Sequence, residues 1–167
     1  KKMNRLRKLL EIIGIAAERL CLDWVSAAEG GRFAQIVDSF TERVRREGPL
    51  ERSSVLLQRL HAAELTVQSE RARWLLGKEL ELLQEGNVFG EKTSASELDL
   101  LINSALEDEY HKSLISLILK ERPLSCKELA GLAGFSPMLI SSCLIDLEEA
   151  GRASLYGFEG KTPKYTA

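Results

Sequence analysis

Residues 113–167 have the sequence SLISLILKERPLSCKELAGLAGFSPMLISSCLIDLEEAGRASLYGFEGKTPKYTA, and this stretch decides the fold of the C-terminal part of the chain. After an apolar run, Ser125 and Glu128 have the spacing of a capping box, in which each side chain accepts a hydrogen bond from the other residue's backbone N–H. Ser136 and Pro137 supply a second N-cap and a first-turn proline. The stretch therefore predicts three consecutive helices.

The third of these helices is expected to end at Gly151, and two strand-like segments follow it. They span residues 153–158 and 161–166 and are joined by a turn at Glu159 and Gly160. A helix, a helix-turn-helix and a β-hairpin in this order form a winged helix-turn-helix. DNA binding is the obvious function of such a module, and the remaining sequence tests it.

The N-terminal part of the chain predicts a fragment of an α/β layer. A basic helix over residues 1–13 stops at Gly14, and residues 20–25 alternate their side chains as a strand does. An amphipathic helix then runs to Gly48. Because one strand alone has no ladder partner for its backbone groups, we expect residues 1–49 to be part of a larger α/β domain.

The middle of the chain is predicted to be helical. Residues 50–85 carry apolar side chains at helical spacing, and a break is expected between Thr66 and Ser69, where a β-branched residue and a good N-cap lie close together. Two stacked helices and one long arm both fit this pattern. A further capping box at Ser94 and Glu97 opens another helix.

The predicted fold class is therefore mainly α, with a partial α/β segment at the N-terminus, a helical middle and a C-terminal winged helix-turn-helix. The predicted domains are residues 1–49, residues 50–93 as a helical linker or arm, and residues 94–167. With 167 residues, 44% of them hydrophobic and 29% charged, the chain has an ordinary globular composition. No apolar run reaches the roughly 18 residues of a membrane span, and no signal peptide is evident, so a cytoplasmic location is expected.

Cysteine and histidine spacing gives no metal site and no catalytic site. The three cysteines, Cys21, Cys126 and Cys143, are far apart, and neither His61 nor His111 completes a zinc pattern with them. The phosphate-binding, nucleotide-binding, hydrolase and metalloprotease motifs are all missing. No catalytic residue, cofactor ligand or metal ligand is assigned.

The third helix of the winged module is poorly suited to reading DNA. Base reading needs Arg, Lys, Asn or Gln on the exposed face of this helix, and residues 136–149 contain none of them. The exposed set is predicted to be Met138, Ser141, Ser142 and Ile145. The module also carries as many acidic as basic residues, so phosphate contacts are few. Packing or protein docking is therefore favoured over DNA binding.

DNA binding stays open as the alternative, with the chain as a winged-helix transcriptional regulator that dimerises through residues 50–85. In that case the candidate nucleic-acid contacts are the cations and the hydroxyl groups of the module, namely Lys127, Ser141, Ser142, Arg152, Lys161 and Lys164. A purely structural scaffold is a third possibility.

Short motifs along the chain resemble a known family. They read ERL at residues 18–20, LDWVSAAEG at residues 22–30, RWLLG at residues 73–77, EGNVFGEK at residues 85–92 and EGKTPKY at residues 159–165, with Phe33 after the second. Together they are similar to the iron-sulfur delta subunit of methyl-viologen-reducing hydrogenase in its long form, which is associated with heterodisulfide reductase. In this resemblance the chain is a C-terminal portion of such a subunit with a winged-helix extension.

The resemblance implies a non-catalytic electron-transfer and assembly subunit of a heterodisulfide-reductase-type or hydrogenase-type complex in an anaerobe. The family's [2Fe-2S] ligands are expected before the position of Lys1, so none of these residues is expected to bind the cluster. Five residues are expected to shape the cluster domain: Trp24, Ser26, Glu29, Gly30 and Phe33. Residues 50–167 are expected to dock a redox partner, either a heterodisulfide-reductase-like flavoprotein or a hydrogenase.

Overall fold

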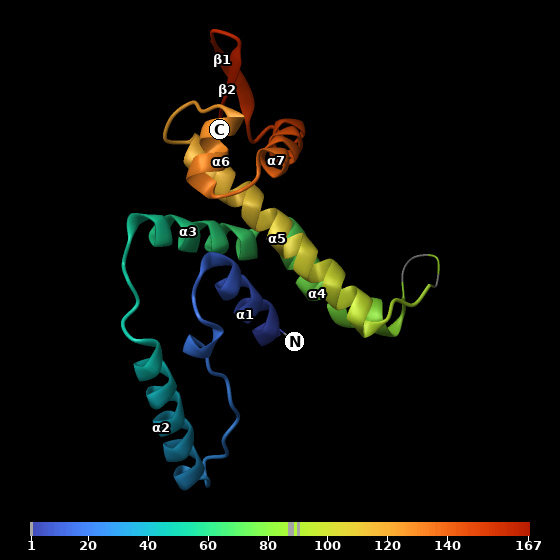
Figure 1. The fold of residues 1–167 in the computed structure, drawn as a ribbon. Helices are drawn as coiled ribbons and strands as arrows, with labels where there is room; N and C mark the ends of the chain where they lie inside the picture. The colour runs from blue at the N-terminus through green and yellow to red at the C-terminus, as the bar shows by residue number, and fades with distance from the viewer. Residues whose placement is uncertain (1, 87–88, 90) are drawn as a thin grey trace. The chain divides into compact units, whose positions relative to one another are not determined.

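The computed structural model describes residues 2–86, 89 and 91–167. The chain forms two compact units, Lys1–Leu56 and Leu57–Ala167. Within the described residues there are seven α-helices, one short 3₁₀ helix and a C-terminal antiparallel hairpin (Figure 1). The prediction of a mainly α fold is confirmed. Three residues of the EGNVFGEK motif, Asn87, Val88 and Gly90, lie outside the described residues.

The first unit contains α1 (Lys2–Ile13), the 3₁₀ helix η1 (Ala17–Arg19) and α2 (Gly30–Glu47). Both predicted helices are confirmed, and both end at a glycine with positive φ, Gly14 at 86° and Gly48 at 70°. The Arg19 guanidinium donates to the backbone carbonyls of Glu47 and Gly48 at 3.1 and 2.7 Å. It thereby satisfies carbonyls that the end of α2 leaves without intrahelical partners.

The strand predicted for residues 20–25 is wrong. These residues have no regular secondary structure, and no described segment forms a ladder with them. The alternating sequence pattern is real, but a strand exists only where a neighbouring strand accepts its backbone hydrogen bonds. The expected α/β fragment is therefore present as two helices joined by a coil.

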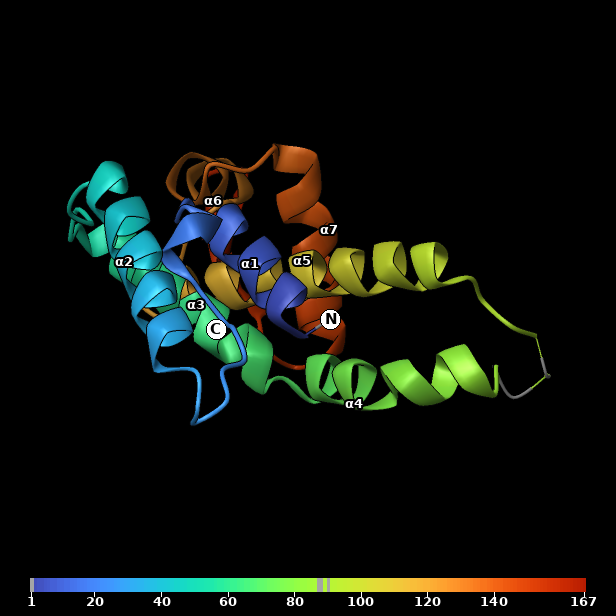
Figure 2. The same cartoon turned by 90° about the horizontal axis from the view of Figure 1, so that it is seen from below.

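In the middle of the chain, α3 (Ser54–Gln68) and α4 (Glu70–Gln84) are separate helices. The predicted break is confirmed at Ser69, whose hydroxyl accepts a hydrogen bond from the Ala72 N–H at 3.2 Å. α4 then folds back along α5 (Ala95–Leu119), as Figures 1 and 2 show. The pair buries a cluster of apolar side chains: Ala72, Leu98, Ile102 and Leu106, with Leu76, Leu82 and Leu83 packed against them.

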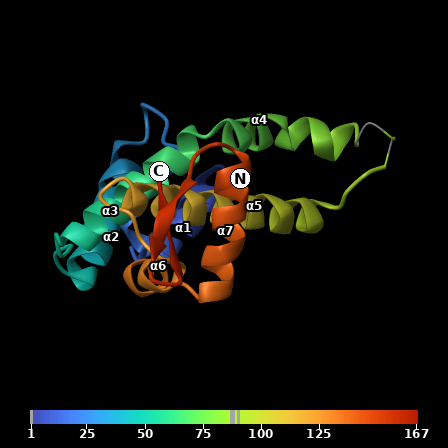
Figure 3. The same cartoon turned by 90° about the horizontal axis from the view of Figure 1, so that it is seen from above.

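The C-terminal module contains the last part of α5, α6 (Cys126–Ala133), α7 (Pro137–Glu149), β1 (Ser154–Glu159) and β2 (Thr162–Thr166). Figure 3 shows the hairpin beside α6 and α7. The capping boxes at Ser94 and Ser125 and the N-cap at Ser136 are confirmed. The hairpin turn lies at Gly160 and Lys161, one residue later than predicted.

Leu124 joins the hairpin through an isolated antiparallel β-bridge with Tyr165. Its backbone N–H donates to the Tyr165 carbonyl at 2.9 Å, and the Tyr165 N–H donates back at 2.8 Å. The module's core is formed by buried side chains from each helix and from Leu124: Leu119, Leu124, Leu129, Ile140, Cys143, Leu144 and Leu147. This arrangement of helices and strands is the predicted winged helix-turn-helix.

Among the described residues, no single helix is long and apolar enough to cross a membrane. Within the part of the chain that the structure describes, one bent pair, α6 and α7 at 111°, has enough apolar length when the two helices are taken together. Part of the apolar surface of this pair is buried in the module's core, where Leu129, Ile140, Leu144 and Leu147 lie.

Candidate functional site

The turn before α2 is held by a local network of hydrogen bonds. The Ser26 N–H donates to the Glu29 carboxylate at 2.8 Å, and the Glu29 N–H donates to the Ser26 carbonyl at 3.0 Å. Arg32 forms ion pairs with Asp23 at 3.2 Å and with Glu29 at 3.5 Å. The structure therefore brings Ser26 and Glu29 together, but as neighbours in one turn.

This network presents aromatic side chains to solvent. Trp24 is 80% exposed and Phe33 is 59% exposed. Phe33 lies on the apolar stripe of α2, and no residue of this amphipathic helix is buried. A helix with an apolar stripe normally buries it. The first unit therefore leaves large apolar side chains exposed in and just before α2, and we call this set the α2 surface: Leu22, Trp24, Phe33 and Val37.

The winged module displays a second apolar surface. As predicted, Met138, Ser141, Ser142 and Ile145 are exposed on α7, with Met138 at 83% and Ile145 at 56%. The hairpin adds two exposed aromatic side chains, Tyr156 and Phe158. Reasoning from the sequence missed these aromatic side chains. Their spacing of two residues in a predicted strand places them on one face of it and could have drawn attention to them.

The wing lysine expected to contact nucleic acid is already paired. Lys164 forms ion pairs with Glu128 at 2.7 Å and Glu159 at 2.8 Å. The hydrogen bond from Lys164, followed by those from Ser125, lowers the pKa of Glu128 from 4.5 to about 2. The hydrogen bonds to Glu128 and Glu159 raise the pKa of Lys164. This cation joins the hairpin to the start of α6.

The remaining candidate contacts are dispersed. Lys127 is exposed on α6, and Lys161 is exposed in the hairpin turn. Arg152 lies at the end of α7 and lines a groove along α5. Lys112, which the sequence did not single out, forms an ion pair with Asp108 of its own helix at 2.9 Å and joins α5 to α7 through Asp146 at 2.6 Å. Burial alone would lower the pKa of Lys112, but the hydrogen bonds to Asp146 and Asp108 outweigh it, so its pKa is raised.

Acidification is expected to loosen the hairpin from α6. The pKa of Glu128 is lower in the folded state than its ordinary value, so the unfolded chain binds more protons in acid. The stabilisation is present above pH 4.5 and is lost as the pH falls toward about 2. Amide chemical shifts of β2, followed by NMR across this range, measure the loss.

Glu128→Gln removes this titration and serves as the control. It is expected to show a weaker pH dependence of the β2 shifts over the same range. An identical pH profile in both proteins would contradict the role given to Glu128.

The cysteines do not fit an iron-sulfur cluster. Cys21 lies in the first unit, whereas Cys126 and Cys143 lie in the second. Burial raises the pKa of the Cys143 thiol to about 11, so it stays protonated. The Cys126 sulfur lies 3.3 Å from the Pro137 carbonyl oxygen. Within the described part of the chain, no three Cys, His, Asp or Glu residues are grouped so as to hold a metal ion.

Comparison with known proteins relates the N-terminal segment to components of redox complexes. Residues 1–48 match the family described as methyl-viologen-reducing hydrogenase, delta subunit. The iron-sulfur subunit of the F420-non-reducing hydrogenase of Archaeoglobus profundus is 37% identical over 51 residues, which cover 30% of this chain and 37% of the archaeal protein. No solved structure matches.

A second relative belongs to a heterodisulfide reductase. This protein, from the ferredoxin/F420H2-dependent CoB-CoM heterodisulfide reductase of Methanosarcina acetivorans, is 36% identical over 50 residues, which cover 30% of this chain and 6% of the relative. The chain thus spans only a part of each relative. The resemblance is confirmed for residues 1–48, which include the α2 surface, and it stays a prediction for the motifs beyond.

Proposed function

We propose that the chain is a non-catalytic electron-transfer and assembly component of a heterodisulfide-reductase-type or hydrogenase-type redox complex. The observation that carries the proposal is that the family match at residues 1–48 coincides with a solvent-exposed apolar surface. Exposed apolar patches of this kind are typical of protein interfaces. In this proposal residues 1–49 are the redox-domain segment, residues 50–93 are an arm, and residues 94–167 are a docking module.

Gly30 leaves room for a close approach by another protein at the start of α2. Its φ does not lie in the left-handed region, and an added Cβ would meet no atom within 4 Å. Neither conformation nor crowding inside the chain therefore requires glycine here. A partner backbone that packs against this position would require it.

The iron-sulfur group of the relatives has no ligand set among the described residues, so no electron-transfer step is assigned to them. Trp24, Ser26, Glu29, Gly30 and Phe33 instead shape the contact surface. The hydrogen bonds between Ser26 and Glu29 fix the turn that presents Trp24. The chain's own contribution is thus to bind and orient a redox partner.

For the winged module, protein docking is a better reading than DNA binding. The exposed face of α7, which we call the α7 surface, carries two apolar side chains and two serines: Met138, Ser141, Ser142 and Ile145. Lys164 already forms ion pairs with two carboxylates. DNA binding depends on cations that are free to neutralise phosphates. A partner that buries Met138, Ile145 and Phe158 would instead gain from removing apolar area from water.

The test is direct binding to the two expected partner classes, a heterodisulfide-reductase-like flavoprotein and a hydrogenase, each purified and measured by biolayer interferometry. Saturable binding to one of them is expected. Trp24→Ala should weaken it about 10-fold or more, because exposed tryptophans that become buried at interfaces are common hot spots. Trp74→Ala, which removes an exposed tryptophan outside the family-matched segment, is the matched control and should leave the affinity unchanged.

Two outcomes would reject the proposal. The first is that neither partner class binds, and the second is that Trp24→Ala and Trp74→Ala have equal effects. Fluorescence anisotropy with mixed duplex DNA at low salt tests the alternative. Submicromolar, salt-sensitive binding there would make the chain a winged-helix regulator.

A further inference from the structure

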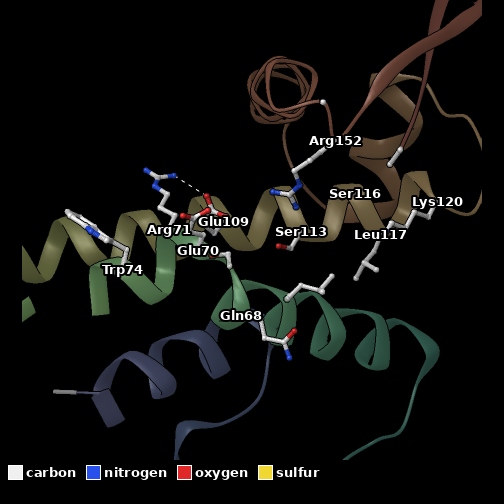
Figure 4. Close-up of a pocket in the computed structure, with 14 residues that line it drawn as sticks. Gln68, Glu70, Arg71, Trp74, Glu109, Ser113, Ser116, Leu117, Lys120 and Arg152 are labelled. Carbon is white, nitrogen blue, oxygen red and sulfur yellow. Dashed lines mark hydrogen bonds and ion pairs between the residues drawn. The ribbon is translucent and has the colours of Figure 1, made fainter. Parts of the chain in front are cut away.

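The second unit contains a large groove that the proposed function does not use. Its volume is about 1010 Å³, and it lies between α5, the junction of α3 and α4, and the segment that follows α7 (Figure 4). This volume is at the upper end of the range for small-molecule sites in proteins.

One wall of the groove is a polar stripe on α5. Glu109, Ser113, Ser116 and Lys120 follow one another at spacings of four, three and four residues, which places them on one face of the helix. Ser113 is 2% exposed and Ser116 is 8% exposed. Within the described part of the chain, neither hydroxyl has a hydrogen-bond partner. Neither Oγ is among the buried side-chain atoms that lack a partner in the described part of the chain, so both hydroxyls reach the space of the groove and are available to a ligand.

Arg152 enters the groove from the opposite side. The end of α7 fixes its backbone, because the Arg152 N–H donates to the Leu147 carbonyl at 2.7 Å and the Gly151 N–H donates to the Glu148 carbonyl at 3.0 Å. These two bonds form a Schellman motif. Figure 4 shows the Arg152 side chain directed toward α5 near Ser113. Neither Arg152 nor Lys120 forms an ion pair with any residue that the structure describes.

The other charges of the groove leave these two cations available. The Arg71 guanidinium forms ion pairs with the carboxylates of Glu109 at 3.3 Å and Asp108 at 2.6 Å. Glu70, in the first turn of α4, is the remaining side-chain carboxylate of the lining. The α4 N-terminus opens onto the same groove and favours negative charge.

We propose that this groove binds the phosphate group of a small phosphorylated ligand. The Arg152 guanidinium and the Lys120 ammonium pair with its oxygens, and the Ser113 and Ser116 hydroxyls donate hydrogen bonds to it. A phosphate offers three or four acceptor oxygens to these donors, and the arginine fork matches two of them. The rest of the groove has room for the organic part of the ligand.

Isothermal titration calorimetry of the full chain tests the proposal with three probes: inorganic phosphate, AMP and acetate. Phosphate and AMP are expected to bind. Arg152→Gln should weaken them about 10-fold or more, the loss expected for one charge-assisted contact. Arg122→Gln, which removes an exposed arginine of the same module outside the groove, should leave the affinity unchanged.

A double variant, Ser113→Ala with Ser116→Ala, tests the α5 stripe. It is expected to weaken phosphate binding while the thermal unfolding midpoint stays the same, since the substitutions break no hydrogen bond within the chain. Equal affinities for phosphate and AMP would show that the groove recognises the phosphate group alone. Tighter binding of AMP would show that the groove also contacts the organic part of the ligand. No binding of either, equal binding of acetate, or unchanged binding by Arg152→Gln would overturn the proposal.

Discussion

Leu129→Ala is expected to lower the free energy of unfolding of the second unit by about 3 kcal/mol, the usual cost of removing a fully buried leucine. Leu129 lies on α6, is 0% exposed and belongs to the core that α5, α6 and α7 share. The truncation leaves a cavity that rigid neighbouring helices fill only in part. Urea denaturation followed by circular dichroism at 222 nm measures the change.

Leu132→Ala is the matched control, because Leu132 lies on the same helix but is 54% exposed. It is expected to change the free energy of unfolding by less than about 0.5 kcal/mol. Equal effects of the two substitutions would mean that α6 does not pack as the structure shows.

Ile145→Glu is expected to weaken binding of the redox partner about 10-fold or more if α7 is the docking surface of the winged module. Ile145 is 56% exposed, so a charge there is tolerated in the free protein. In a complex that buries the α7 surface, the new carboxylate would lose its water without gaining a partner. The loss of affinity is measured by biolayer interferometry, with the same redox partner that is used to test Trp24→Ala.

Leu132→Glu makes the same chemical change on α6, away from the α7 surface, and should leave the affinity close to that of the unchanged protein. Circular dichroism confirms that both variants are folded. Unchanged binding by Ile145→Glu would show that the winged module docks elsewhere or not at all, without bearing on the α2 surface.

Helix ends were the features best predicted from the sequence. The caps at Ser94, Ser125 and Ser136 and the break at Ser69 all lie where the sequence placed them. Each depends on hydrogen bonds that reach only three residues along the chain. Such local interactions are encoded in neighbouring residue types and need no tertiary information.

The candidate site was predicted less completely. Helical periodicity predicted both faces of α7: the buried apolar face and the exposed residues, which are Met138, Ser141, Ser142 and Ile145. The strand at residues 20–25 failed because alternation shows which side chains share a face but not whether a ladder partner exists. Ser113 and Ser116 went unnoticed as a site, since serines among apolar residues of α5 have no local signature.

By itself, the sequence determined the helix caps, the winged helix-turn-helix and the shortage of DNA-reading side chains in α7. It did not show that the helix opened at Ser94 and the first helix of the winged module are one continuous helix, α5. Only the tertiary structure decided how the charges are used. It pairs Lys164 with Glu128, which is 36 residues away in the chain, and it brings Arg152 to the serine stripe of α5. The physical reason is range: caps and periodicity act over a few residues, whereas ion pairs and grooves depend on elements that meet only after the chain has folded.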